Sequence, residues 1–248
     1  MKKTDLHTHS NYCDGQNTPE EMIWAAIDQG MDEIGIVVHG HTAFDESYCV
    51  SLDGARAFKK EMRELKEDYG EEIRVRIGVE QDLYSDMPTR GFDYVIGSVH
   101  YLKLEDGYYP VDESEESFRL LAKEKFGGDY YALAEKYFEE AATVLKVTGA
   151  DYVGHLDLIT KFNEGGRLFD ENDPRYIQAA LACVDQLLPF KKPFEINTGA
   201  IARGYRKSPY PSKFLRDYIK KNGGRFILSS DAHRAEDLMY GFEHFRRV

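Results

Sequence analysis

The stretch Glu33-Ile34-Gly35-Ile36-Val37-Val38-His39 is an almost unbroken apolar run that ends in a histidine. Strands of a parallel sheet are covered on both faces, so they appear in a sequence as short continuous runs of this kind. Amphipathic segments separate this run from others like it, and seven strands that alternate with helices predict a parallel sheet with helices outside it. The other predicted strands are Lys3–His7, Ile73–Leu83, Phe92–Leu102, Asp151–Ile159, Pro193–Thr198 and Phe226–Asp231.

Helix signals lie between these runs. Thr18-Pro19-Glu20-Glu21 combines an N-cap residue, a proline at the first helical position and two acids in the first turn. Gly30 stands where that helix should end. Pro174 and Pro211 are placed to begin two later helices. The sequence therefore alternates between strand and helix along its whole length.

Length and loop composition favour a closed barrel over an open sheet. Barrels built of strands and helices commonly form one domain at about this length of 248 residues. No glycine-rich phosphate-binding loop follows the first strand, although the common nucleotide-binding open sheets require one. We expect an α/β barrel of the TIM type, a single domain over residues 1–248, with its active site at the carboxyl ends of the strands. The segment Glu105–Gly128 is interpreted as an insertion in a loop on that face.

The charge balance excludes some partners. The chain carries 32 lysines and arginines against 44 aspartates and glutamates, a formal net charge of −12. Broad nucleic-acid-binding surfaces are basic, so none is expected. The sequence has no run of about 18 apolar residues and no apolar secretory signal near its start, so no membrane partner is predicted. Three scattered cysteines, Cys13, Cys49 and Cys183, are typical of free thiols in the cytoplasm.

Seven of the eight histidines fall at or near the end of a predicted strand. Three acids, Asp14, Glu80 and Asp231, occupy the same zone. Because the carboxyl ends of parallel strands meet at one face of a barrel, these side chains should converge. Imidazoles combined with carboxylates suit Zn, Fe or Mn and disfavour an all-oxygen magnesium site. The seven histidines are His7, His9, His39, His41, His100, His155 and His233.

The fragment His7-Thr8-His9 is the most specific metal signal. Residues i and i+2 of a strand point to the same side, so both imidazoles can reach one ion. The fragment is followed by Ser10-Asn11-Tyr12-Cys13-Asp14-Gly15 and is matched near the other end of the chain by Ser230-Asp231-Ala232-His233. Together these segments predict a metal centre built from both ends of the chain.

These motifs resemble a known family. Asp5-Leu6-His7-Thr8-His9-Ser10 with Asp14-Gly15 is similar to the opening motif of the PHP (polymerase and histidinol phosphatase) superfamily. Gly97-Ser98-Val99-His100, Gly154-His155-Leu156-Asp157 and Ser230-Asp231-Ala232-His233 follow in the order of the family. Glu195-Ile196-Asn197-Thr198-Gly199, then Arg203 and Tyr210-Pro211-Ser212, resemble its histidinol-phosphate phosphatase branch. The resemblance implies a distorted seven-stranded barrel with three divalent metal ions.

The resemblance also implies a ligand set. His7, His9, Glu80 and Asp231 would hold one ion, and Glu80 would bridge to a second ion. His100 and His155 would complete the second site, whereas Asp14, His39 and His233 would hold the third ion. The sequence departs from the family at the second strand, where Val38 stands in place of the usual acid before His39, and His41 follows two residues later. We expect His39 to be the ligand, with His41 as an alternative ligand or as a residue behind the ligands that helps to bind substrate.

The expected chemistry follows from charge. Three divalent ions, three carboxylates and one bridging hydroxide leave about two positive charges, which attract a phosphate monoester dianion. Two neighbouring ions can generate hydroxide at neutral pH and hold the attacking and leaving oxygens in line. Arg203 after the sixth predicted strand and Lys161 after the fifth are candidate phosphate-binding cations. We expect Asp231, His233 and Arg203 to act in catalysis.

The predicted activity is hydrolysis of a small phosphorylated metabolite, L-histidinol phosphate, as in histidine biosynthesis. Two alternatives stay open at this point. Another phosphoesterase of the same superfamily would act on phosphotyrosyl protein or on nucleotides. A regulatory module would bind metal ions without catalysis, although such a module has no chemical need for nine ligands.

Overall fold

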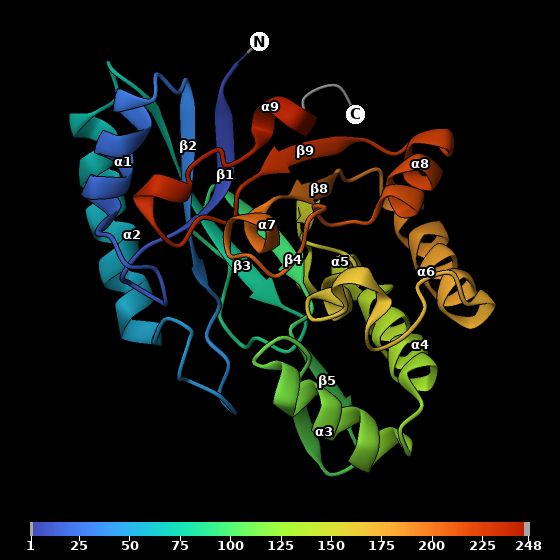
Figure 1. Ribbon diagram of the computed structural model, residues 1–248. Helices are drawn as coiled ribbons and strands as arrows, with labels where there is room; N and C mark the ends of the chain where they lie inside the picture. Colours follow the sequence, from blue (N-terminus) through green and yellow to red (C-terminus); the bar gives the residue numbers. More distant parts are fainter. Residues whose placement is uncertain (1, 246–248) are drawn as a thin grey trace.

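Seven parallel strands form the centre of the molecule (Figure 1). The computed structural model describes residues 2–245. The seven strands lie side by side in the order in which they occur along the chain, and the connection from β4 to β7 also carries a separate two-stranded sheet and three helices. The central strands are β1 Thr4–His9, β2 Glu33–His39, β3 Arg74–Asp82, β4 Tyr94–Ser98, β7 Tyr152–Val153, β8 Phe194–Asn197 and β9 Phe226–Ser229.

The first and last strands close this sheet into a barrel. Beyond the end of β9, Ala232 pairs in parallel with Thr8 of β1, and its carbonyl accepts a hydrogen bond from the His9 amide at 2.8 Å. The buried carboxylate of Asp5 accepts hydrogen bonds from the amide of Ser230 at 3.1 Å and from the Ser230 hydroxyl at 2.5 Å. The predicted distorted seven-stranded barrel is thereby confirmed.

Helices cover the outside of the barrel. Figure 1 shows α1 and α2 beside β1–β3, and α6 and α8 beside β8 and β9. Thr18 forms a capping box with Glu21, and Pro174 occupies the first turn of α6, as predicted. Pro211 lies ahead of its helix instead, because Ser212 is the N-cap residue. The helices are α1 Pro19–Asp28, α2 Leu52–Asp68, α3 Glu115–Phe126, α4 Tyr130–Ala141, α5 Val144–Thr148, α6 Pro174–Leu187, α7 Gly199–Ala202, α8 Lys213–Lys221 and α9 Phe242–Phe245.

Two predicted strands are much longer than the strands observed, whereas three others exceed theirs by only one or two residues at an end. The run Phe92–Leu102 divides into β4 and a separate strand, because the chain leaves the barrel at His100. That second strand, β5 (Tyr101–Leu104), pairs antiparallel with β6 (Gly107–Pro110). The hairpin and α3 replace the irregular loop expected over residues 105–128, and they project beside the carboxyl ends of the strands (Figure 1). The run Asp151–Ile159 forms only the two-residue strand β7 before the chain turns at Gly154.

A tyrosine fills the interior of the barrel. Tyr94 is 3% exposed, packs with Val37 and Ile96, and donates a hydrogen bond from its hydroxyl to the Leu6 carbonyl at 2.6 Å. A Cβ at Gly78 would lie 2.4 Å from the Tyr94 ring, so this strand position has no room for a side chain. The filled interior leaves the carboxyl ends of the strands as the polar end of the barrel. None of the described helices is long and apolar enough to cross a bilayer.

Candidate metal centre

Histidines and carboxylates meet at the carboxyl ends of the strands. β1 supplies His7 and His9, β2 supplies His39, and β3 supplies Glu80. The segments that follow the other strands bring further ligands, and the loop after β1 brings Asp14. All but two of these side chains are buried, the exceptions being Asp14 and His233. The structure thus brings together all nine predicted ligands, which are His7, His9, Asp14, His39, Glu80, His100, His155, Asp231 and His233.

Glu80 lies at the centre of the cluster. Its Oε2 atom is 3.1 Å from Nε2 of His7, 3.4 Å from Nε2 of His9 and 3.0 Å from Nδ1 of His39. On the other side, Oε1 is 2.8 Å from Nε2 of His155 and 3.4 Å from Nε2 of His100. One carboxylate therefore faces two sets of imidazoles, as a bridge between two ions would require.

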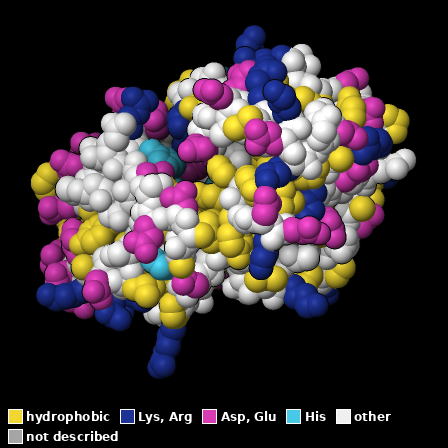
Figure 2. Space-filling view, turned by 90° about the horizontal axis from the view of Figure 1, so that it is seen from below, with side chains coloured by type: hydrophobic (Ala, Val, Ile, Leu, Met, Phe, Trp, Pro, Cys, Tyr) yellow, Lys and Arg dark blue, Asp and Glu magenta, His cyan; other side chains and the backbone are white. Residues whose placement is uncertain are grey.

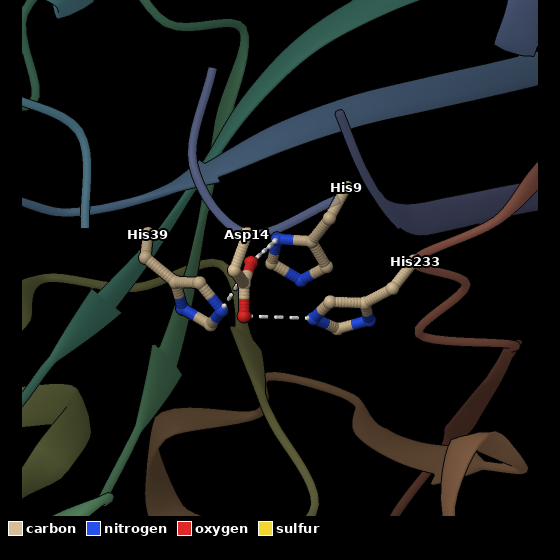
Figure 3. Close-up of side chains that lie close together, drawn as sticks. All are labelled: His9, Asp14, His39 and His233. Carbon is tan, nitrogen blue, oxygen red and sulfur yellow. Dashed lines mark hydrogen bonds and ion pairs between the residues drawn. The ribbon is translucent and has the colours of Figure 1, made fainter. Parts of the chain in front are cut away.

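Asp14 organises a second group, shown in Figure 3. Its Oδ1 atom is 3.4 Å from Nε2 of His39 and 3.9 Å from Nδ1 of His9, and its Oδ2 atom is 3.2 Å from Nε2 of His233. The rings of His39 and His233 both stack with the imidazole of His9, and each ring centroid lies 4.3 Å from that of His9. Asp14, His39 and His233, the residues predicted for the third ion, therefore lie together, and His9 adjoins them as well as Glu80.

The remaining predicted ligand, Asp231, connects the groups. Its Oδ1 atom lies 3.4 Å from Nε2 of His9 and 3.7 Å from Nε2 of His7. Burial alone would raise the pKa of Asp231, but the charges of Arg203 and His7 hold it well below its ordinary value. The Asp231 carboxylate is therefore ionised and available as a ligand.

The donor set fits divalent ions. Oε2 of Glu80 is buried and makes no well-aligned hydrogen bond with the described residues, although three imidazole nitrogens lie within 3.4 Å of it. Buried polar atoms nearly always have a partner, and an ion is a common explanation when protein donors are absent. Burial would raise the pKa of Glu80, but the charges of His7 and His39 hold it well below its ordinary value. An ionised carboxylate among imidazoles matches Zn, Fe or Mn.

Two carboxylates behind the ligands were missed in the sequence. Oε1 of Glu195 on β8 is 2.5 Å from Nδ1 of His7. Asp82 on β3 accepts the amide hydrogen of His100 at 2.7 Å and lies 3.3 Å from Nδ1 of that ring. Their sequence signal was weak. Asp82 follows Glu80 by two residues and so points to the same side of its strand, and Glu195 was used only as part of a family motif.

His41 does not join the cluster. The second strand ends at His39, and the chain turns away at Gly40. Nδ1 of His41 pairs with Asp86 at 2.5 Å, and its Nε2 atom is 3.5 Å from Glu46. The structure therefore places His39 among the ligands and turns His41 toward two other acids. His41 is also not among the residues that line the cavity described next.

A cavity of about 320 Å³ opens above the cluster. Figure 2 looks onto this end of the molecule, where histidine side chains show in a hollow bordered by acidic and apolar ones. Its lining includes Glu80, Asp231 and His233 from the cluster. The walls carry two cations, three acids and three tyrosines, namely Lys161, Arg203, Asp45, Asp112, Glu113, Tyr48, Tyr101 and Tyr205.

Both predicted phosphate-binding cations line this cavity. Arg203 donates to Oδ2 of Asp231 at 3.0 Å and to the Asp231 carbonyl at 2.9 Å. A Cβ at Gly199 would lie 2.9 Å from the Arg203 guanidinium, so this glycine leaves room for the pair. Lys161 donates to the carbonyl of Asp112 at 2.6 Å and to its carboxylate at 3.1 Å. Each cation is thus held by an acid at the edge of the site.

We predict that chelation releases one ion before the others. The side chain of Asp14 is 35% exposed and that of His233 is 20% exposed, whereas His7 and His9 are fully buried. Removing an ion from a buried cluster leaves unpaired charges out of water, which typically costs several kcal/mol. Metal analysis after timed exposure to a chelator should show that one equivalent of metal is lost before the rest. The Asp14→Asn variant should lack that equivalent and keep the others. Simultaneous release of every ion would contradict the prediction.

The fold and this cluster define a metal-dependent phosphoesterase of the α/β-barrel class. The chain belongs to the PHP domain family, whose family model matches residues 5–199.

Relatives match nearly the whole chain. A Deinococcus radiodurans protein provisionally named histidinol-phosphatase is 29% identical over 96% of this chain and 89% of its own length. A Listeria monocytogenes structure with a provisional histidinol phosphatase name superposes with a TM-score of 0.85, at 20% identity, covering 98% of this chain and all of that one. The Lactococcus lactis histidinol phosphate phosphatase, solved with Zn, L-histidinol and phosphate, gives a TM-score of 0.67 at 22% identity, covering 94% of this chain and 87% of that one.

Proposed function

We propose that this chain hydrolyses L-histidinol phosphate to L-histidinol and inorganic phosphate, with three divalent ions bound by the nine residues of the cluster. The observation that carries the proposal is the central position of Glu80 between two sets of imidazoles, at the floor of a cavity lined by two cations. The Lactococcus lactis relative, which was solved with L-histidinol and phosphate, supports the choice of substrate.

The ligands divide around three positions. His7, His9, Glu80 and Asp231 would hold one ion. Glu80 would also bind a second ion, together with His100 and His155. Asp14, His39 and His233 would hold the third. Divalent ions bound there would lower the pKa of a water molecule and neutralise phosphoryl oxygens, which is the chemistry that phosphate ester hydrolysis needs.

Arg203 and Asp231 act as a pair in this scheme. The Arg203 guanidinium donates a hydrogen bond to Oδ2 of Asp231, whereas Oδ1 of Asp231 faces the imidazoles of His7 and His9. The remaining N–H groups of Arg203 can donate to phosphoryl oxygens, for which its forked geometry is suited. Lys161 adds a second positive charge on the wall of the cavity. His233 lies between the pair and Asp14, beside the position proposed for the phosphate.

Acids and tyrosines in the walls of the cavity suit a cationic organic group. Asp45, Asp112 and Glu113 line it, and Asp112 is paired with Lys161. The Asp45 carboxylate accepts a hydrogen bond from the Tyr101 hydroxyl at 2.5 Å, which fixes both groups. Acids and tyrosine rings together favour an amine or an imidazolium over a second phosphate, because ammonium groups pair with carboxylates and pack on aromatic faces. L-histidinol phosphate carries both kinds of group beside one phosphate.

Isotope labelling tests the reaction class. Metal-loaded protein is incubated with L-histidinol phosphate in ¹⁸O-water, and both products are analysed by mass spectrometry. Hydrolysis at phosphorus should place the label in inorganic phosphate and leave L-histidinol unlabelled. Label in L-histidinol, or no phosphate release, would contradict the proposal.

Replacing Arg203 tests the phosphate-binding role. Arg203→Ala should lower kcat/KM about 10²–10³-fold, the typical loss when one preorganised donor to developing charge is removed. Arg203→Lys should recover part of the loss, because a single ammonium cannot reproduce the fork. Metal content should stay unchanged, since the guanidinium has no free lone pair. Kinetics and elemental analysis are measured together.

Lys207→Ala provides the matched control, because it removes an exposed cation from the same loop. It should behave like the unchanged protein. If Arg203→Ala also keeps its kcat/KM, Arg203 does not bind the phosphate. If Arg203→Ala loses metal, its role is to hold Asp231.

A further inference from the structure

Glu195 is a buried acid beneath the metal centre that does not line the cavity. Its side chain on β8 is completely buried. Oε1 lies 2.5 Å from Nδ1 of His7. Oε2 accepts hydrogen bonds from the backbone N–H of His155 at 3.0 Å and from the side-chain amide of Asn197 at 3.2 Å. Both oxygens of this carboxylate are therefore committed to residues of the site.

The contact with His7 determines which ring nitrogen can bind metal. Nε2 of His7 faces the cluster, 3.1 Å from both Glu80 and Nε2 of His9. The opposite nitrogen, Nδ1, faces Glu195. When Nδ1 carries the proton and donates it to Glu195, the lone pair lies on Nε2, where an ion would be bound. A carboxylate behind a histidine ligand fixes the tautomer, orients the ring and makes the other nitrogen a stronger donor.

The contact with His155 connects Glu195 to a different part of the centre. His155 approaches Oε1 of Glu80, whereas His7 approaches Oε2 of the same residue. Glu195 contacts the backbone N–H of His155 and the ring of His7. A displacement of its carboxylate would therefore move ligands on both sides of the central acid.

A second carboxylate has a narrower role. Asp82 contacts the ring and the amide of His100. Its hydrogen bonds and its ion pair go to Tyr84 and His100, and none goes to His7 or His155. Asp82 is therefore a useful comparison, because it stands behind one ligand of one proposed ion.

We propose that Glu195 is a positioning residue that sets His7 and His155 on the two sides of Glu80 and is required for tight binding of the two ions that share that acid. The inference rests on the ligand assignment made for the proposed function. It adds a residue that touches neither substrate nor metal and predicts which two ions depend on it.

The test measures metal binding without substrate. The purified protein, Glu195→Gln, Glu195→Ala and Asp82→Asn are each titrated with Zn²⁺ against a competing chelator, and Co²⁺ absorption spectra are recorded. Glu195→Gln keeps the shape and a hydrogen-bond acceptor but loses the charge. It should weaken two of the three ions about 10–100-fold, the usual effect of removing a carboxylate behind a ligand. The third ion should bind unchanged, and the Co²⁺ spectrum should shift. Asp82→Asn should weaken one ion.

Glu140→Gln is the matched control, because Glu140 is also buried but lies on α4, away from the ligands. Its carboxylate accepts a hydrogen bond from the backbone N–H of Lys103 and pairs with the side chain of Lys136. It should leave all metal affinities unchanged. Wild-type affinities in Glu195→Gln would overturn the proposal. So would an equal loss of all three ions accompanied by a lower Tm of the metal-free protein, since that pattern shows a structural role. Should Glu195→Ala fail to fold, Glu195→Gln decides alone.

The two proposals fail separately. Glu195-dependent metal affinity in a protein that does not hydrolyse L-histidinol phosphate would support the positioning role and reject the proposed function. A Glu195→Gln enzyme that hydrolyses L-histidinol phosphate and binds its metal ions with unchanged affinity would support the proposed function and reject the positioning role.

Discussion

Glu80→Gln is expected to lower kcat/KM for L-histidinol phosphate by about 10³-fold or more and to reduce bound metal by more than one equivalent. The substitution keeps the size of the side chain but removes the charge that two sets of imidazoles face. A neutral amide cannot bridge two divalent ions and presents an N–H group to one of them. Elemental analysis and steady-state kinetics of the same preparation provide the measurement.

The comparison variant is again Glu140→Gln, a buried acid-to-amide change outside the site. It should retain full metal content and nearly full activity. A Glu80→Gln protein that still binds three ions and keeps more than a tenth of its activity would show that Glu80 is not a bridge.

Complete removal of metal should abolish activity, with a loss of about 10³-fold or more. The cavity floor without ions presents acids to a phosphate dianion, and these repel it. Adding Mn²⁺ or Zn²⁺ should restore the activity, whereas Mg²⁺ should restore little of it, because imidazoles are poor ligands for Mg²⁺. Metal binding should also raise Tm, since the ions bind only the folded cluster. Activity that survives exhaustive chelation, confirmed by elemental analysis, would contradict this prediction.

The barrel could be predicted because its strands are covered on both faces. Glu33–His39 was placed with its observed bounds, since burial on both sides leaves a continuous apolar run. Strand ends were less predictable, because pairing with a neighbour decides them. Only two residues form β7, although the apolar run continues to Ile159. The hairpin β5–β6 depends on the turn at His100, which no local pattern in the run 92–102 marks.

The ligand candidates could be found because parallel strands bring their ends to one place. The residues that orient these ligand side chains could not be found from the sequence. Glu195 lies 188 positions after His7, and their side chains meet only because the closed barrel brings β1 and β8 together on either side of β9. The position of His41 was equally hidden, because its ring is turned away by contacts with two loop acids. Contacts of this kind follow from three-dimensional packing and not from spacing along the chain.

Substrate preference provides the most direct test of the central claim. The metal-loaded protein is assayed with L-histidinol phosphate, a phosphotyrosine peptide and nucleoside monophosphates, with kcat/KM measured for each. The cavity is lined by two cations, three wall acids and the proposed metal ligands, and it predicts that L-histidinol phosphate has the highest kcat/KM, by about tenfold or more. One well-placed ion pair or hydrogen bond gives a difference of this size. A higher kcat/KM for the phosphotyrosine peptide or for a nucleotide would contradict it.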